Sequence, residues 1–227
     1  MFTITLSMPF IPTLAIFDLD GTLIEYEHEF LFNEAERILP NIGFAHVTRD
    51  EFVDHFENDN MFGFIHDEGE RKKVEEHFWI HLHKGHRPSP NTIEGALETL
   101  DHLASRGIKL AIATARAQLE THLRDELQHT GLLRWVDIIT SRDTHDDPWR
   151  DKRKQIFLAC QHVSASPQES FMVGDSPSDI WSAHAISIGC PIAVRTGRIN
   201  DEVLLVEKPY TILDHVGELK GIIPFRK

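Results

Sequence analysis

Short apolar runs alternate with longer amphipathic segments over much of the sequence. The apolar runs cover residues 14–17, 108–113, 136–139, 170–174 and 191–194. The intervening segments carry apolar residues every three or four positions and cover residues 92–105, 117–129, 152–163 and 177–188. Buried strands that alternate with helices of roughly 10–15 residues are typical of βαβ units. The pattern therefore predicts an α/β fold, a doubly wound parallel sheet with helices on both faces.

Residues 25–87 break this alternation. They contain no clean buried strand, and their apolar residues recur at helical spacing, as in Leu31, Ala35, Ile38, Val74, Phe78 and Leu82. A proline-rich stretch at residues 87–91 separates them from the next predicted helix. We therefore expect an α/β core of residues 1–24 and 88–227, with a small helical cap of residues 25–87 inserted after the first strand.

The chain of 227 residues is acidic, with 23 Lys+Arg against 36 Asp+Glu and a net charge of −13. Nucleic-acid and anionic-lipid surfaces usually attract basic proteins, so we expect neither partner. Cys160 and Cys190 are the only cysteines, too few for a disulfide framework, which favours a cytoplasmic location. No apolar run is long enough to span a membrane. The sequence does not specify an oligomeric state.

Polar residues directly follow three of the predicted strands. Asp18 and Asp20 follow the first strand, Thr114 follows the second, and Asp175 and Asp179 follow the fourth. In open parallel sheets, ligands bind beyond the carboxyl ends of the strands, so these side chains should converge. Four converging carboxylates would repel one another, and a hard divalent cation would relieve that repulsion. Because the ligands are all oxygens, Mg²⁺ is the expected ion.

The first of these segments has a local geometry suited to a site. Residues i and i+2 of an extended segment point to the same side, so Asp18 and Asp20 should face one space. Gly21 allows a tight turn beside that space. Lys152 and Lys154, at the start of the helix before the fourth strand, can supply a cationic donor.

In this order, the motifs resemble the haloacid dehalogenase superfamily of phosphohydrolases, over residues 14–195. The matching stretches are Ile16-Phe17-Asp18-Leu19-Asp20-Gly21-Thr22, Thr114 at a strand end, Lys152, and Gly174-Asp175-Ser176-Pro177-Ser178-Asp179. The resemblance implies a Rossmann-like core, and the insertion falls where such proteins carry a helical cap. It also implies Mg²⁺-dependent hydrolysis of a phosphate monoester, with a small phosphorylated metabolite as substrate.

The resemblance also implies a role for each matching residue. Asp18 would be the nucleophile that forms an aspartyl-phosphate, and Asp20 would be the acid and base. Thr114 and Lys152 would hold the phosphoryl oxygens. The metal would be held by Asp18, Asp175 and the backbone carbonyl of Asp20, and Asp179 would complete this acidic network directly or through water.

Several alternatives stay open at this point. No proline follows Lys152, as one often does in this family, so Lys154 is a second choice for the phosphate ligand. Arg116 either reaches the substrate or faces solvent. Asp179 also fits a helix capping box that begins at Ser176, with or without a role in the site.

The function has alternatives as well. A phosphomutase or phosphotransferase on the same core would pass the phosphoryl group to a second hydroxyl, and a non-catalytic binding module would not turn over at all. In the dehalogenase branch, the position of Asp20 lacks the second acid, because a halide leaving group needs no proton. Asp20 therefore favours phosphoryl chemistry over dehalogenation.

Overall fold

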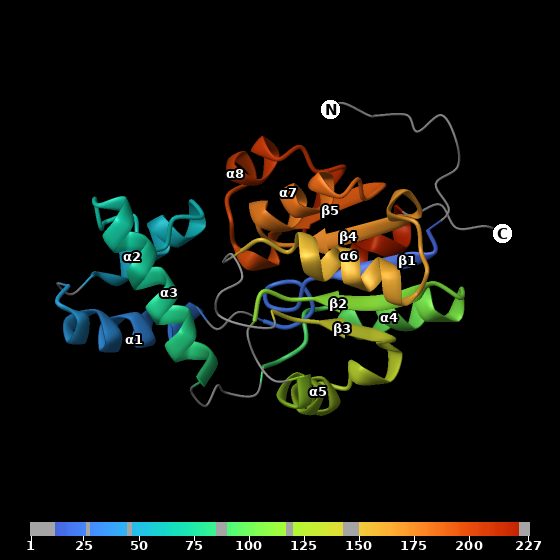
Figure 1. The fold of residues 1–227 in the computed structure, drawn as a ribbon, viewed down its shortest axis with the longest axis horizontal. Coiled ribbons are helices and arrows are strands. Elements are labelled where there is room, and N and C mark those ends of the chain that lie inside the picture. Colours follow the sequence, from blue (N-terminus) through green and yellow to red (C-terminus); the bar gives the residue numbers. More distant parts are fainter. Residues whose placement is uncertain are drawn as a thin grey trace.

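The computed structural model describes residues 12–25, 28–44, 47–84, 90–116, 120–142 and 150–222. Their six parallel strands form one sheet with the order β3-β2-β1-β4-β5-β6 (Figure 1). The strands are β1 (Leu14–Phe17), β2 (Lys109–Ala113), β3 (Ile138–Thr140), β4 (Ser170–Gly174), β5 (Cys190–Val194) and β6 (Thr211–Leu213). The order reverses at β1, which lies between β2 and β4. A crevice is expected where the chain order reverses, beyond the carboxyl ends of β1 and β4.

Helices cover both faces of this sheet. They are α4 (Ala96–Ser105), α5 (Glu120–His129), α6 (Arg153–His162), α7 (Pro177–Ala185) and α8 (Asp201–Val206). Ala15 and Phe17 of β1 belong to a hydrophobic cluster with α4 and α5, whereas Leu14 and Ile16 belong to a cluster with α6 and α7. This alternation is the two-residue period of a strand buried on both faces. The predicted doubly wound α/β fold is confirmed.

The burial of β1 is the main local reason for its stability. All four of its side chains are at most 1% exposed, and Phe17 makes an edge-to-face contact with Phe171 of β4 at 6.1 Å between ring centroids. Each large apolar side chain buried in this way contributes about 1.5–3 kcal/mol. The strand therefore gives a rigid support to the residues that follow it.

Residues 28–84 contain three helices that lie to one side of the layered part of the molecule (Figure 1). They are α1 (His28–Ile38), α2 (Arg49–Glu57) and α3 (Glu68–Lys84). At the start of α2, the Thr48 hydroxyl accepts a hydrogen bond from the Glu51 amide at 3.3 Å, a typical N-cap. The six apolar residues listed from the sequence all belong to one hydrophobic cluster within these helices. We call this segment the helical insertion.

Some elements differ from the sequence expectation. Helix α4 begins at Ala96 rather than at residue 92, because Gly95 has a left-handed backbone conformation (φ 74°) just before it. Strand β6 and helix α8 are absent from the sequence prediction, and the six residues of α8 are too few to show a helical period. Residues 117–119 of the helix predicted to begin at residue 117 lie outside the described residues.

Within the part of the chain that the structure describes, no helix is both long and apolar enough to cross a membrane.

Candidate active site

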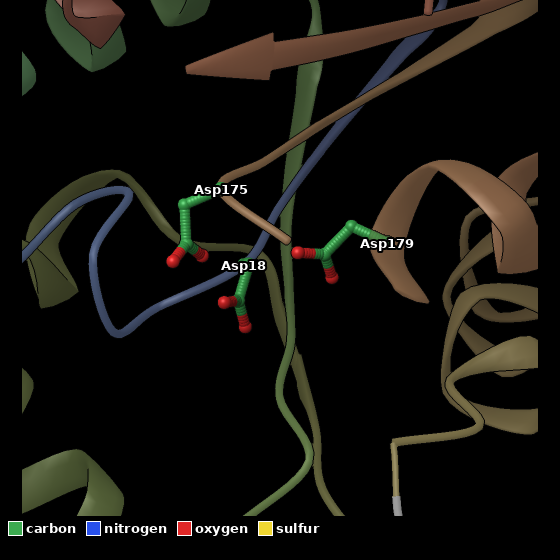
Figure 2. A group of neighbouring side chains, drawn as sticks. All are labelled: Asp18, Asp175 and Asp179. Atoms are coloured by element: carbon green, nitrogen blue, oxygen red, sulfur yellow. The ribbon is translucent and has the colours of Figure 1, made fainter. Parts of the chain in front are cut away.

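Three carboxylates meet at the carboxyl end of the sheet (Figure 2). Asp18 follows β1, Asp175 follows β4, and Asp179 lies in the first turn of α7. One oxygen from each of them lies within 4.8 Å of the other two. All three side chains are buried, at 6%, 4% and 0% exposure. The structure thus brings together three acids that the sequence places up to 161 residues apart.

Two glycines allow this close approach. A Cβ at Gly174 would overlap the Asp179 carboxylate, and a Cβ at Gly197 would overlap the Asp175 carboxylate. Gly174 belongs to the motif recognised in the sequence, and its role is to let Asp179 pack against the backbone. Gly197 lies in the short 3₁₀ helix after β5 (Arg195–Gly197), and no sequence signal pointed to it.

Asp179 has both of the roles considered for it. Its Oδ2 accepts hydrogen bonds from the Ser176 amide at 3.1 Å and from the Ser176 hydroxyl at 2.8 Å. These bonds fix the start of α7, where Pro177 takes the first helical position. Its other oxygen, Oδ1, faces the Lys152 ammonium at 2.6 Å. The helix start and the acidic cluster are therefore built by the same side chain.

Lys152 lies between two of the acids, whereas Lys154 is exposed on α6. The Lys152 Nζ atom is 2.6 Å from Asp18 Oδ1 as well as 2.6 Å from Asp179 Oδ1. Burial alone would lower the pKa of Lys152, but the carboxylates of Asp179 and Asp18 raise it above its usual value. Lys152 is thus held as a buried ammonium next to the proposed nucleophile.

One lysine does not balance the buried negative charge. The pKa of Asp18 is raised to about 6, mainly by burial and also by the charge of Asp179, although Lys152 opposes this shift. The pKa of Asp175 is raised well above its ordinary value by burial and by the charges of Asp18 and Asp179. Such raised values indicate a site that favours additional positive charge. Because the donors are all carboxylate oxygens, the site fits a hard divalent ion such as Mg²⁺.

Asp20 is not part of this three-carboxylate group but lies beside Arg116. The Arg116 Nε atom donates to Asp20 Oδ2 at 2.6 Å, and Nη2 donates to Oδ1 at 2.5 Å. Arg116 Nη1 also donates to both carboxylate oxygens of Glu126, at 2.9 and 3.0 Å. The alternative in which Arg116 faces solvent is wrong, because the residue is only 2% exposed.

Thr114 is placed at the end of β2, as its strand predicted. Its backbone amide donates to the Thr140 carbonyl at 3.0 Å, and its hydroxyl accepts from the Arg116 amide at 3.2 Å. The side chain is 1% exposed. The next residue, Ala115, lines the cavity beside Asp18.

A cavity of about 80 Å³ opens in front of Asp18. Its described lining combines Asp18, Lys152, Asp175, Ser176 and Ser178 of the sheet region with Phe56, Asp59, Met61 and Trp79 of the helical insertion. Arg150, which also lines it, donates to Asp59 Oδ1 at 2.5 Å and to Glu75 Oε1 at 3.0 Å. The insertion therefore forms one wall of the cavity, and no motif in the sequence pointed to these wall residues.

The family model for haloacid dehalogenase-like hydrolases matches residues 15–193, which is most of the chain. The chain belongs to this family. The match includes Asp18, Thr114, Lys152, Asp175 and Asp179 in the order described above. The resemblance stated from the sequence is therefore confirmed.

Relatives and solved structures agree with this family membership. The haloacid dehalogenase-like hydrolase described here is 29% identical to a phosphoglycolate phosphatase of Agrobacterium fabrum, covering 94% of this chain and 92% of that protein. It is 27% identical to the pyrophosphatase PpaX of Bacillus pumilus, covering 92% of this chain and 94% of that protein. A solved structure of a predicted phosphatase from Clostridium acetobutylicum has the same fold, with a TM-score of 0.72, 19% identity and coverage of 93% and 97%. The predicted enzyme class, a phosphatase of the haloacid dehalogenase-like family, is confirmed.

Proposed function

We propose that this protein is a Mg²⁺-dependent phosphatase that hydrolyses a small phosphate monoester through an aspartyl-phosphate on Asp18. The observation that carries the proposal is the surroundings of Asp18. Its carboxylate lines a cavity, lies 2.6 Å from the Lys152 ammonium, and belongs to a buried group of three acids. The proposal is supported by a carboxylate that could act as nucleophile, an ammonium that could meet the phosphate and a group of acids that could hold a metal, all close together.

The carboxylates of Asp18, Asp175 and Asp179 would hold the metal, together with the backbone carbonyl of Asp20. When bound, Mg²⁺ supplies positive charge that lets an anionic nucleophile approach an anionic phosphate. Lys152 and Thr114 would hold the phosphoryl oxygens. The Lys152 ammonium is already buried at this position, so it can exchange a carboxylate oxygen for a phosphoryl oxygen without a large movement.

The proposed chemistry proceeds in two displacements. In the first, an Asp18 oxygen bonds to phosphorus, the bond from phosphorus to the ester oxygen breaks, and Asp20 gives that oxygen a proton. In the second, Asp20 takes a proton from water, the water oxygen bonds to phosphorus, and the bond to Asp18 breaks. Splitting one difficult displacement into two through a covalent intermediate lowers the barrier of each. A residue that acts as acid and base at the correct place typically raises the reaction rate by about 10²–10⁴-fold.

The proposal extends to the arrangement of the chain and the size of the substrate. We place the division between a core of residues 1–24 and 88–227 and a cap of residues 25–87. The cap's own hydrophobic cluster and its contribution to the wall of the cavity support this division. A cavity of about 80 Å³ favours a small phosphorylated metabolite. Phosphoglycolate and pyrophosphate, named for two relatives, are the first substrates to try.

The test is hydrolysis of 4-nitrophenyl phosphate, phosphoglycolate and pyrophosphate by the purified protein, with Mg²⁺ or with a chelator. We expect activity that requires Mg²⁺ and is abolished by Asp18→Asn. Asp125→Asn, an exposed acid on α5, is the matched control and should stay active. Equal activity in Asp18→Asn would refute the mechanism.

Product analysis separates the proposal from phosphoryl transfer. A phosphatase releases one inorganic phosphate for each alcohol formed from the two esters, and two for each pyrophosphate, whereas a mutase or phosphotransferase returns the phosphate to a second hydroxyl. Complete recovery of the phosphate as a new ester would therefore overturn the hydrolytic assignment. No turnover on any of the three compounds, with Mg²⁺ bound, would favour the binding module instead.

A further inference from the structure

Asp20 is held by a chain of buried charges that the proposed chemistry does not yet use. Asp20 lies after β1, Arg116 lies in the loop after β2, and Glu126 lies on α5. Arg116 uses Nε and Nη2 on the two oxygens of Asp20 and Nη1 on the two oxygens of Glu126. The side chains of Arg116, Asp20 and Glu126 are 3%, 9% and 18% exposed. One guanidinium therefore joins two carboxylates 106 residues apart.

The geometry of these contacts is specific. Two parallel hydrogen bonds from one guanidinium to both oxygens of a carboxylate fix the plane of that carboxylate as well as its position. The backbone of Arg116 is fixed too, since its amide donates to the Thr114 hydroxyl and its carbonyl accepts from the Arg142 amide at 3.1 Å. Glu126 then restrains the far side of the guanidinium. Asp20 is thus held more firmly than its own short loop could hold it.

We propose that Arg116, anchored by Glu126, is a positioning residue that orients Asp20 for proton transfer to the leaving oxygen. This inference rests on the proposed phosphatase function. A carboxyl oxygen has two lone pairs, so an Asp20 oxygen that accepts a hydrogen bond from Arg116 can also carry the proton that it gives to the ester oxygen, while the carboxyl plane stays fixed. Proton transfer needs the donor atom within hydrogen-bond reach of its target, and a freely rotating carboxylate satisfies that condition only part of the time.

A positioning role for Arg116 affects some substrates more than others, which a merely structural role would not do. A leaving group that is a weak base departs without a proton, whereas a more basic one needs the proton from Asp20. If Asp20 loses its orientation, hydrolysis should therefore slow most for esters whose leaving group is strongly basic. A general loss of structure around the cavity would slow every ester to the same extent.

The experiment measures kcat and KM of Arg116→Met, Arg116→Lys and Glu126→Gln on a series of substituted phenyl phosphates, from 4-nitrophenyl to 4-methoxyphenyl. For Arg116→Met we expect kcat to fall no more than about threefold on 4-nitrophenyl phosphate and about 10²-fold on the 4-methoxyphenyl ester, with KM changed little. Arg116→Lys keeps the positive charge but lacks the two parallel hydrogen-bond donors of the guanidinium. Its loss of kcat should therefore also grow from the 4-nitrophenyl to the 4-methoxyphenyl ester. Glu126→Gln should show the same trend more weakly.

Asp125→Asn, on the same helix as Glu126, is the matched control and should show no trend. A uniform loss across the series, or no loss at all, would overturn the inference. If thermal melting shows that Arg116→Met is unfolded, Arg116→Lys and Glu126→Gln decide the outcome. An inactive wild-type protein would refute the proposed function itself, whereas an active one whose variants lose rate uniformly would refute this inference alone.

Discussion

At the residue scale, Gly197 is the side-chain-free position that lets Asp175 lie beside Asp18 and Asp179 in the proposed metal site. A Cβ there would overlap the Asp175 carboxylate, so Gly197→Ala must turn Asp175 away from Asp18 and Asp179. We expect the Mg²⁺ concentration for half-maximal activity to rise about 10-fold, the lower end of the effect of disturbing a metal ligand's support. The measurement is activity as a function of Mg²⁺ concentration.

Gly221→Ala is the control for that substitution. A Cβ at Gly221 would have open space around it, and the residue does not need a left-handed backbone. Its Mg²⁺ dependence should equal that of the wild type. An unchanged Mg²⁺ dependence in Gly197→Ala would show that the Asp175 carboxylate does not need its present position.

The buried acids also link stability to pH. In the metal-free protein, burial raises the pKa of Asp18 from 3.8 to about 6, and Asp175 shifts in the same direction. A carboxyl whose pKa is raised by folding stabilises the folded state when protonated. That contribution is complete below pH 3.8 and is lost as the pH rises through about 6. Mg²⁺ binds the ionised carboxylates, so it should restore the stability where they are ionised.

We therefore expect Mg²⁺ to raise the melting temperature more at pH 7.5 than at pH 5. At 100 times its dissociation constant, a ligand adds about 2.7 kcal/mol, which corresponds to about 5–10 °C for a protein of this size. Thermal melts with and without Mg²⁺ at the two pH values give the measurement. Asp175→Asn should lose most of the increment at pH 7.5, and an equal increment at both pH values would contradict the linkage.

At the scale of elements, the sequence predicted those that form a continuous apolar run or a long amphipathic segment. Strand β1 and strand β4 are continuous apolar runs that end in acids, so both their position and their role in the site could be inferred. Helix α8 ends with Leu205 and Val206 exposed, and β6 is only three residues long, so neither shows a buried face in the sequence. Short elements of this kind form because they pair with or pack against the sheet edge at β5.

The contacts between elements could not be predicted from the motifs. Arg116 pairs with an acid 96 residues away, and Arg150 pairs with Asp59 at a separation of 91 residues. Nothing in the local sequence distinguishes these arginines from exposed ones. The strand order brings the loops after β1 and β2 together, and the helical insertion forms one wall of the cavity. These three-dimensional arrangements determine the partners of the two arginines.

Arg150, which lies just before α6, pairs with two acids of the helical insertion. Its ion pairs with Asp59 and Glu75 are partly buried, with side-chain exposures of 20–29%. A pair of this kind is worth about 0.2–1 kcal/mol, so losing both corresponds to a change of about 2-fold to 30-fold in an equilibrium. We expect Arg150→Met to lower kcat/KM on 4-nitrophenyl phosphate about threefold to tenfold, because the wall of the cavity is held less firmly.

Arg153→Met is the control for this prediction, since Arg153 pairs with Asp151 outside the cavity lining. A double-mutant cycle tests the cause. In an Asp59→Asn, Glu75→Gln background, Arg150→Met should produce little further loss. A full additional loss in that background would mean that Arg150 acts on the substrate directly rather than by holding the insertion.

At the scale of the whole molecule, the acidity is uneven. Residues 25–87 carry 7 basic and 15 acidic side chains, and the rest of the chain carries 16 and 21. This segment, which contains the helical insertion that forms a wall of the cavity, therefore carries −8 of the net charge of −13. Its field opposes an approaching phosphate at long range, so binding must depend on Lys152 and the metal at short range.

This distribution predicts an unusual salt dependence for an enzyme with an anionic substrate. Salt shortens the electrostatic range from about 30 Å at 0.01 M to about 8 Å at 0.15 M, which screens the repulsion from the insertion but hardly affects a buried lysine. We expect kcat/KM, measured with KCl at saturating Mg²⁺, to stay level or to rise by less than about threefold over that range. Neutralising three exposed acids of α3, by Glu68→Gln, Glu70→Gln and Glu76→Gln together, should raise kcat/KM at low salt and remove the dependence. A steep fall of kcat/KM with salt would instead require a positive surface that guides the phosphate to Asp18.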